Sequence, residues 1–146
     1  MTHPLTTELT IEEIVENFEV LDDWDDRYSY LIELGRLLKP MAEDEQNANT
    51  KVEGCVSQVW VTHSLDETGD QKVLHFRGTS DAHIVRGLVA ISLTLLSGRS
   101  PAEIAGIDAE KTFTQIGLQD HLSMQRANGL RAMVKRLKEI AAAHMQ

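Results

Sequence analysis

The chain has 146 residues, of which 42% are hydrophobic and 25% are charged, so it is long enough for one globular domain with a buried core. Its formal net charge of −9 argues against binding to nucleic-acid phosphates or anionic membranes, which both require clustered Lys and Arg. The single cysteine excludes an internal disulfide, a CxxC redox pair and a thiolate zinc site.

The first residues show no basic region followed by an apolar run, and the most apolar stretch, residues 84–96, is too short to span a bilayer. We therefore expect a cytoplasmic protein in which residues 1–146 form a single domain. A late basic stripe has helical spacing, so we interpret it as a solvated helix face that could also dock an acidic protein partner. Its members are Arg126, Arg131, Lys135, Arg136 and Lys138.

Two helices are predicted in the first 40 residues. Thr10 and Glu13 form the pattern of a capping box, and an apolar stripe at helical spacing follows. The second helix begins at the acidic residues 23–26, whose carboxylates favour the positive end of the helix dipole, and it is stopped by Pro40. Gly35 inside this helix costs about 1 kcal/mol relative to Ala. Such a glycine indicates close packing, which we expect against the first helix.

After the polar segment 41–50, the apolar residues alternate with period two. Val59 and Val61 belong to one such run, and residues 73–77 form another after the turn-like DETGD, which predicts an antiparallel hairpin. A third strand is expected near Val52. If the hairpin turns about Gly69, His63 and His75 lie opposite each other. Two histidines without a third ligand make a poor zinc site, so we expect a solvated pair and no bound metal.

A largely apolar helix is expected next, and we take it as the central buried helix. Ser80 and Asp81 are both good N-caps for it, and it runs to Leu96 with Gly98 as its C-terminal stop.

Three more helices follow, and the element order then predicts the fold class. A capping box with proline at the first helical position lies at residues 100–103, another helix spans about 109–116, and the last begins near Ser123. Helices, a small sheet and helices again predict an α+β fold. We expect a two-layer sandwich in which a small antiparallel sheet of about three strands is covered by helices.

The position of Cys55, after a glycine and before a strand, leaves three interpretations open. It could be a small buried hydrophobe, as free cysteine often is. It could be an enzyme nucleophile, which needs a base that the sequence alone does not bring to it. It could also be a group-carrying thiol that takes sulfur from another protein's cysteine, by a displacement similar to thiol–disulfide exchange. The carrier role suits a solitary cysteine, because a resolving thiol would expel the bound sulfur.

Four segments resemble motifs of the SufE family in the family's order: WDDRYSYLIELGRLL, VEGCVSQVWV, GTSDAHIVRGLVAISLTLLSGRSPAEI and GLQDHLSMQRANGLRAMV. The resemblance spans nearly the whole chain. It implies an acceptor of sulfane sulfur from a SufS-type cysteine desulfurase, which is a pyridoxal-phosphate enzyme. Such an acceptor stimulates the desulfurase and delivers the sulfur to the SufBCD scaffold for iron–sulfur cluster assembly. It implies no cofactor and no stand-alone enzymatic activity for this chain.

By this resemblance Cys55 is the persulfide-forming acceptor, at a loop tip whose side chain tucks into an apolar cavity. Gly54 would allow a turn that a side chain would obstruct. Ser57 and Gln58 match the family's polar pair after the cysteine and would fix the loop through backbone hydrogen bonds. Trp60 is expected in the core, because buried aromatic residues dominate small cores.

Asp81 and Arg126 match family positions near the loop. Asp81 is either a helix cap or a restraint on the loop. Arg126 falls in the first turn of its helix, which is unfavourable for a cation and indicates a specific partner, either Asp81 or the Cys55 loop. A guanidinium close to the thiol would lower the pKa of Cys55. The chain departs from the family pattern at Thr50, where asparagine is common, and at residues 124–125, where Pro-Ser is common.

Three rival functions compete with the sulfur carrier. A CsdE-type acceptor would use the same chemistry with a different desulfurase and recipient, and the segment VSQVW favours the SufE type. A SufU or NifU scaffold would need several cysteine ligands. A module that activates a desulfurase without carrying sulfur is the third, and Cys55→Ser distinguishes it from a carrier.

Overall fold

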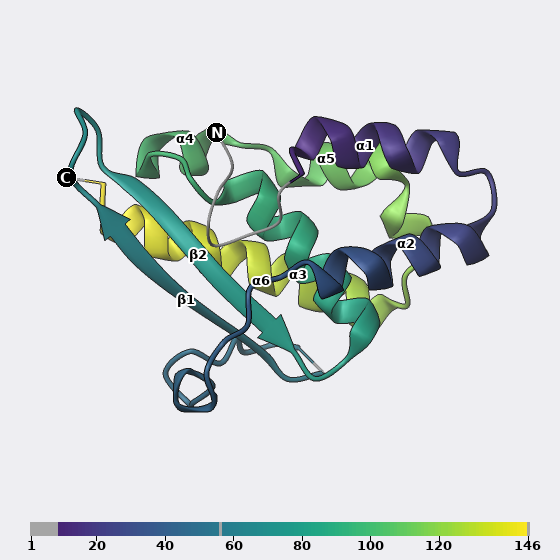
Figure 1. Ribbon diagram of the computed structural model, residues 1–146, viewed down its shortest axis with the longest axis horizontal. Helices are drawn as coiled ribbons and strands as arrows, with labels where there is room; N and C mark the ends of the chain where they lie inside the picture. Colours follow the sequence, from purple (N-terminus) through teal and green to yellow (C-terminus); the bar gives the residue numbers. More distant parts are fainter. Residues whose placement is uncertain (1–8, 56, 146) are drawn as a thin grey trace.

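The computed structural model describes residues 9–55 and 57–145. Within them the chain forms six α-helices and a two-stranded antiparallel sheet, which confirms the predicted α+β fold (Figure 1). Two short 3-10 helices, η1 (Glu43–Glu45) and η2 (Leu118–Asp120), lie in the connections. The other elements are α1 (Ile11–Val20), α2 (Trp24–Arg36), β1 (Val59–Asp66), β2 (Val73–Ser80), α3 (His83–Leu96), α4 (Pro101–Gly106), α5 (Ala109–Ile116) and α6 (Met124–Ala143).

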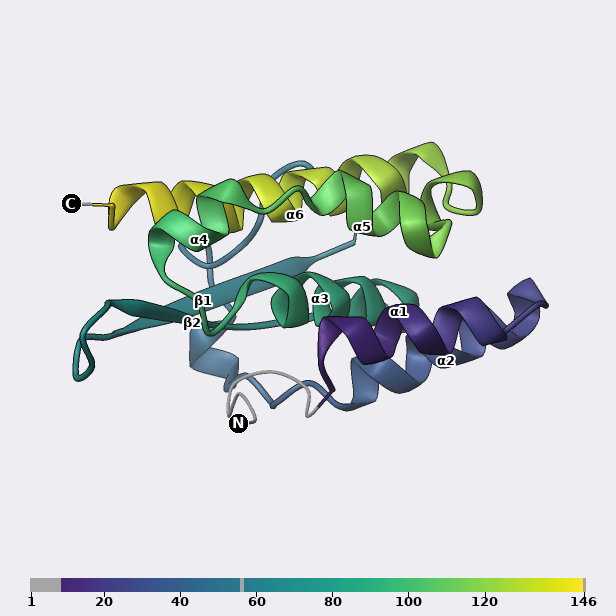
Figure 2. The ribbon, with the colours of Figure 1, turned by 90° about the horizontal axis from the view of Figure 1, so that it is seen from above.

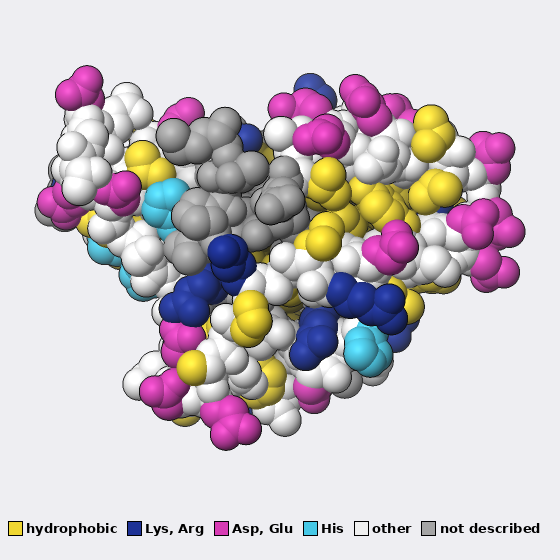
Figure 3. Space-filling view, in the orientation of Figure 1, with side chains coloured by type: hydrophobic (Ala, Val, Ile, Leu, Met, Phe, Trp, Pro, Cys, Tyr) yellow, Lys and Arg dark blue, Asp and Glu magenta, His cyan; other side chains and the backbone are white. Residues whose placement is uncertain are grey.

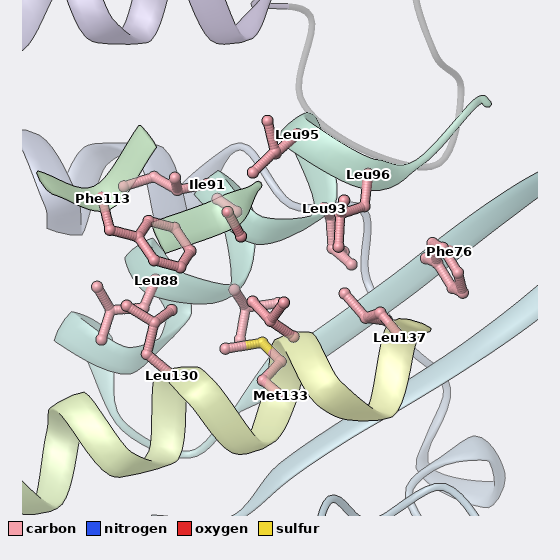
Figure 4. Packing of buried hydrophobic residues seen from close by; sticks show 14 of the residues in the cluster. Phe76, Leu88, Ile91, Leu93, Leu95, Leu96, Phe113, Leu130, Met133 and Leu137 are labelled. Carbon is pink, nitrogen blue, oxygen red and sulfur yellow. The ribbon is translucent and has the colours of Figure 1, made fainter. Parts of the chain in front are cut away.

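Helix α3 is the centre of the core. Figure 2 shows it between α1 and α2 on one side and α4, α5 and α6 on the other. Except for Arg86, every residue from Val85 to Leu96 is buried, as predicted for a helix that is apolar on most faces. In Figure 4, Leu88 on α3 lies close to Phe113 of α5 and Leu130 of α6. This packing holds α6 against the core and places its first turns beside the loop that carries Cys55.

The predicted local signals at most helix ends are confirmed. The hydroxyl of Thr10 accepts a hydrogen bond from the backbone N–H of Glu13, whose carboxylate accepts one from the N–H of Thr10. Ser100 and Glu103 form the same reciprocal box at α4. These caps depend on residues three apart, so the sequence alone is enough to predict them.

The predicted start of α3 is wrong. Strand β2 extends through Ser80, and the N-cap of α3 is Ala82, which has no side chain able to accept a hydrogen bond. Ser80 Oγ accepts the N–H of Ala82 instead of capping the helix. Asp81 does not cap the helix either, and its carboxylate instead accepts a hydrogen bond from the Cys55 loop, as described below.

The close packing predicted at Gly35 exists, but its partner is α3 and not α1. A Cβ at Gly35 would lie 2.7 Å from the Cβ of Arg86, and a Cβ at Gly87 would lie 2.2 Å from the carbonyl oxygen of Leu31. Two glycines therefore allow α2 and α3 to approach backbone to backbone. The sequence marks the glycine but does not identify which helix crosses it.

The sheet has two strands, where about three were predicted. The segment before Cys55 contributes only an isolated bridge between Lys51 and Trp60, flanked by bonds from Val52 N–H to Val59 O and from Val61 N–H to Thr50 O. The turn built on the Asn47 side chain precedes this segment, which leaves it too short for a full strand. Trp60 is half-buried and pairs with Thr79, outside the main core cluster where it was predicted.

The predicted pairing of His63 with His75 is off by one residue. His63 lies opposite Phe76, and His75 lies opposite Ser64, so the two histidines point to opposite faces of the hairpin. The ring of His63 instead lies 5.5 Å from the ring of His144, at the end of α6. Among the described residues, no three His, Cys, Asp or Glu side chains gather where they could hold a metal ion. None of the described helices is long and apolar enough to cross a membrane.

Candidate functional site

Cys55 lies at the tip of a loop between the Lys51 bridge and β1. The bond from Val52 N–H to Val59 O, 2.8 Å long, closes the base of this loop. Gly54 has a φ of +90°, a conformation that residues with a side chain rarely adopt. The loop therefore turns sharply just before Cys55 and directs the thiol towards α6.

The thiol rests in a cavity of about 400 Å³ between the loop, α3 and α6. Cys55 is half-buried, and its Sγ donates a weak hydrogen bond to the carbonyl oxygen of Gly129, 3.5 Å away. The apolar part of the cavity wall is formed by Val59, Val85, Leu88, Leu130 and Met133. The polar part is formed by Ser57, Ser123, Gln125 and Arg126. The cavity can shield a small sulfur species from water while one side carries a cation.

Asp81 restrains the far end of the loop. One oxygen of its carboxylate accepts the backbone N–H of Gln58 at 3.1 Å, and its own N–H donates to the Gln58 carbonyl at 3.2 Å. Of the two interpretations of Asp81, the geometry matches the loop restraint and not the helix cap. The predicted backbone bonds of the polar pair involve Gln58, while Ser57 contributes a wall of the cavity.

Arg126 lines the cavity that holds Cys55, and of the two partners predicted for it, Asp81 forms no ion pair with it in the described part of the chain. The backbone N–H of Arg126 donates to the Ser123 hydroxyl, which caps α6. Within the described part of the chain, the ion pairs join Arg77 to Glu45 and Arg131 to Glu110, and none involves Arg126. Arg126 is thus an exposed cationic residue in the lining of the cavity.

The electrostatic environment keeps the resting thiol neutral. Burial raises the pKa of Cys55 above the ordinary thiol value, and the negative charge of Glu53 raises it further. The lowering of this pKa that was expected from Arg126 does not occur in this position. Because the thiolate is the nucleophile, Cys55 is held here in its unreactive form.

Gly129 is a site residue that the sequence reasoning missed. It is buried inside α6, and a Cβ placed on it would lie 3.4 Å from the Sγ of Cys55. The sequence did contain one indication of this role. Gly129 lies in the interior of a predicted helix, where only proline is less favourable than glycine, so a close contact could have been suspected there.

Three comparisons show which known proteins the chain is similar to. A family model described as "SufE: Fe-S metabolism associated domain" matches residues 12–141. An uncharacterized SufE-like protein of Rhizobium etli is 51% identical over 133 residues, which are 90% of this chain and 89% of that protein. One of Rhizobium meliloti is 50% identical over 137 residues, which are 93% of this chain and 97% of that protein. The solution structure of a hypothetical protein from Thermus thermophilus has a TM-score of 0.69 at 21% identity, covers 98% of this chain and 97% of that one, and supports the fold.

Proposed function

The chain belongs to the SufE family, and from this membership we propose that it accepts persulfide sulfur on Cys55 from a SufS-type cysteine desulfurase. The observation that carries the proposal is the position of the only cysteine, at a loop tip over a cavity that can shelter the added sulfur. A buried structural cysteine would have no need of the loop or the cavity.

The transfer is a displacement at sulfur. The Cys55 thiolate attacks the outer sulfur of a persulfide on the desulfurase cysteine, a new S–S bond forms at Cys55, and the old S–S bond breaks. The desulfurase cysteine leaves as a thiolate, so no external oxidant or reductant is needed. Holding the two sulfur atoms in line contributes several kcal/mol to such a reaction.

The retracted thiol is neutral, so the loop must move before it reacts. Outside the cavity water solvates the thiolate, which removes the main cause of the raised pKa, and Arg126 in the cavity lining supplies a positive charge that attracts the anion. Exposing one side chain of this size costs about 1 to 3 kcal/mol, which docking to a partner can supply. After transfer the loop returns, and the cavity protects the persulfide from stray thiols.

We extend the proposal to the partners on the same basis. The loaded protein delivers its sulfur to the SufBCD scaffold in the cytoplasm, and docking of the empty protein stimulates the desulfurase by removing its persulfide. Gly54, Ser57, Gln58 and Asp81 serve in this scheme as supports of the moving loop.

Desulfurase stimulation tests whether the chain carries sulfur or only activates its partner. Alanine release from cysteine by a SufS-type enzyme is measured with wild-type protein and with Cys55→Ser. A carrier loses stimulation in Cys55→Ser, because persulfide is no longer removed from the desulfurase. Ser64→Ala, an exposed change on β1, is the control and stimulates like the wild type. Full stimulation by Cys55→Ser would replace the carrier with a pure activator.

A further inference from the structure

We infer that Gly129 and Ala132 of α6 form a seat for residues 54 and 55, and that the missing side chain at Gly129 sets how readily the thiol leaves its cavity. The inference rests on the proposed function of Cys55 and concerns the regulation of that same site. It assigns a positioning residue, since Gly129 acts through Cys55.

Gly129 fits Cys55 closely. A Cβ at this position would lie 3.4 Å from the Sγ of Cys55 and 3.8 Å from both its Cα and its Cβ. The Gly129 carbonyl also accepts the thiol hydrogen bond at 3.5 Å. These are ordinary van der Waals distances, so an alanine would only touch the docked side chain, whereas a larger side chain such as valine would overlap with it.

Ala132 provides the second half of the seat. A Cβ placed on Gly54 would lie 3.2 Å from the Cβ of Ala132, so the turn and the helix touch here as well. Residues three apart on a helix share one face, so Gly129 and Ala132 face the loop together. Two neighbouring loop residues thus rest on two neighbouring small residues of α6.

The seat couples loop position to thiol reactivity. Docked on α6, Cys55 is half-buried and its thiol stays neutral. Away from α6, the thiol regains its ordinary acidity and reacts. Added bulk at position 129 weakens only the docked state and so raises the population of the reactive one.

The test is the alkylation rate of Cys55 by iodoacetamide as a function of pH, followed by intact mass. Gly129→Val should raise the rate at neutral pH on the order of tenfold, as expected when a fitted contact is overpacked. The midpoint of the pH profile should move down towards that of an ordinary cysteine. Gly106→Val is the matched control, because a Cβ at Gly106 meets no atom within 4 Å, and it should leave the profile unchanged.

A second variant keeps the inference testable if Gly129→Val does not fold. Ala132→Leu adds bulk against Gly54 from the other half of the seat and should accelerate alkylation in the same direction. Folded variants at both positions with wild-type alkylation profiles would overturn the seat, even if their thermal stability changed. The assay needs no desulfurase. If the variants are alkylated faster but the wild-type protein never gains sulfur, the seat would be supported and the acceptor function would be wrong.

Discussion

Cys55 lies at an accessible loop tip, but its thiol has a raised pKa and is therefore less reactive than an ordinary cysteine. The loop presents its thiol near the surface, yet burial and Glu53 both raise the pKa of the thiol. An enzyme nucleophile is usually activated where it rests. A thiol that is inactive at rest suits a carrier, because it avoids oxidation and unwanted exchange until a partner draws the loop out.

Glu53 offers a direct test of this electrostatic picture. Its carboxylate disfavours the nearby thiolate, so Glu53→Gln should lower the pKa of Cys55 and shift the alkylation profile towards lower pH. The shift should be small, because Glu53 is exposed and salt screens it, and it should shrink further at high salt. Glu67→Gln removes the same charge at the hairpin turn and should not shift the profile. An upward shift, or equal shifts in both variants, would contradict the assignment.

Among the elements, the crossing of α2 and α3 positions one wall of the site. α3 contributes Val85 and Leu88 to the cavity, and its backbone is held against α2 by the close approach at Gly87. The position of this cavity wall therefore depends on the contact between α3 and α2.

Gly87→Ala should destabilise the whole protein. The new Cβ would lie 2.2 Å from the Leu31 carbonyl oxygen, a backbone atom that cannot move aside, so the helices must separate. Overpacking of this kind typically costs about 1 to 3 kcal/mol. Urea or thermal unfolding measures the loss, with the open-space variant Gly106→Ala as the reference. A Gly87→Ala protein as stable as the wild type would show that the crossing is not close.

Elements with local signals could be predicted from the sequence, and those that depend on distant contacts could not. The caps at Thr10 and Ser100 follow from side chains three residues apart. The hairpin register depends on the geometry of its turn, and a slip of one residue was enough to misplace His63 against His75. The role of Gly129 becomes visible only when the loop is seen against α6, although the cysteine and its loop were evident from the sequence.

Over the molecule as a whole, charge is distributed unevenly. On the face in Figure 3, Asp and Glu lie mainly around the periphery, including the corner between α1 and α2, whereas Lys and Arg gather nearer the middle. With a net charge of −9, this pattern favours a protein partner over a nucleic acid or an anionic membrane. The fold places the thiol between a hairpin and two helices, where one loop controls its exposure.

Sulfur transfer to Cys55 can be read from the intact mass of this protein after incubation with a SufS-type desulfurase, pyridoxal phosphate and cysteine. Wild-type protein should gain the mass of one sulfur atom, lose it on reduction, and show no gain in Cys55→Ser. Peptide mapping should place the added sulfur on Cys55. Wild-type protein that stays unmodified while the desulfurase turns over, or sulfur that persists in Cys55→Ser, would show that Cys55 is not the sulfur carrier.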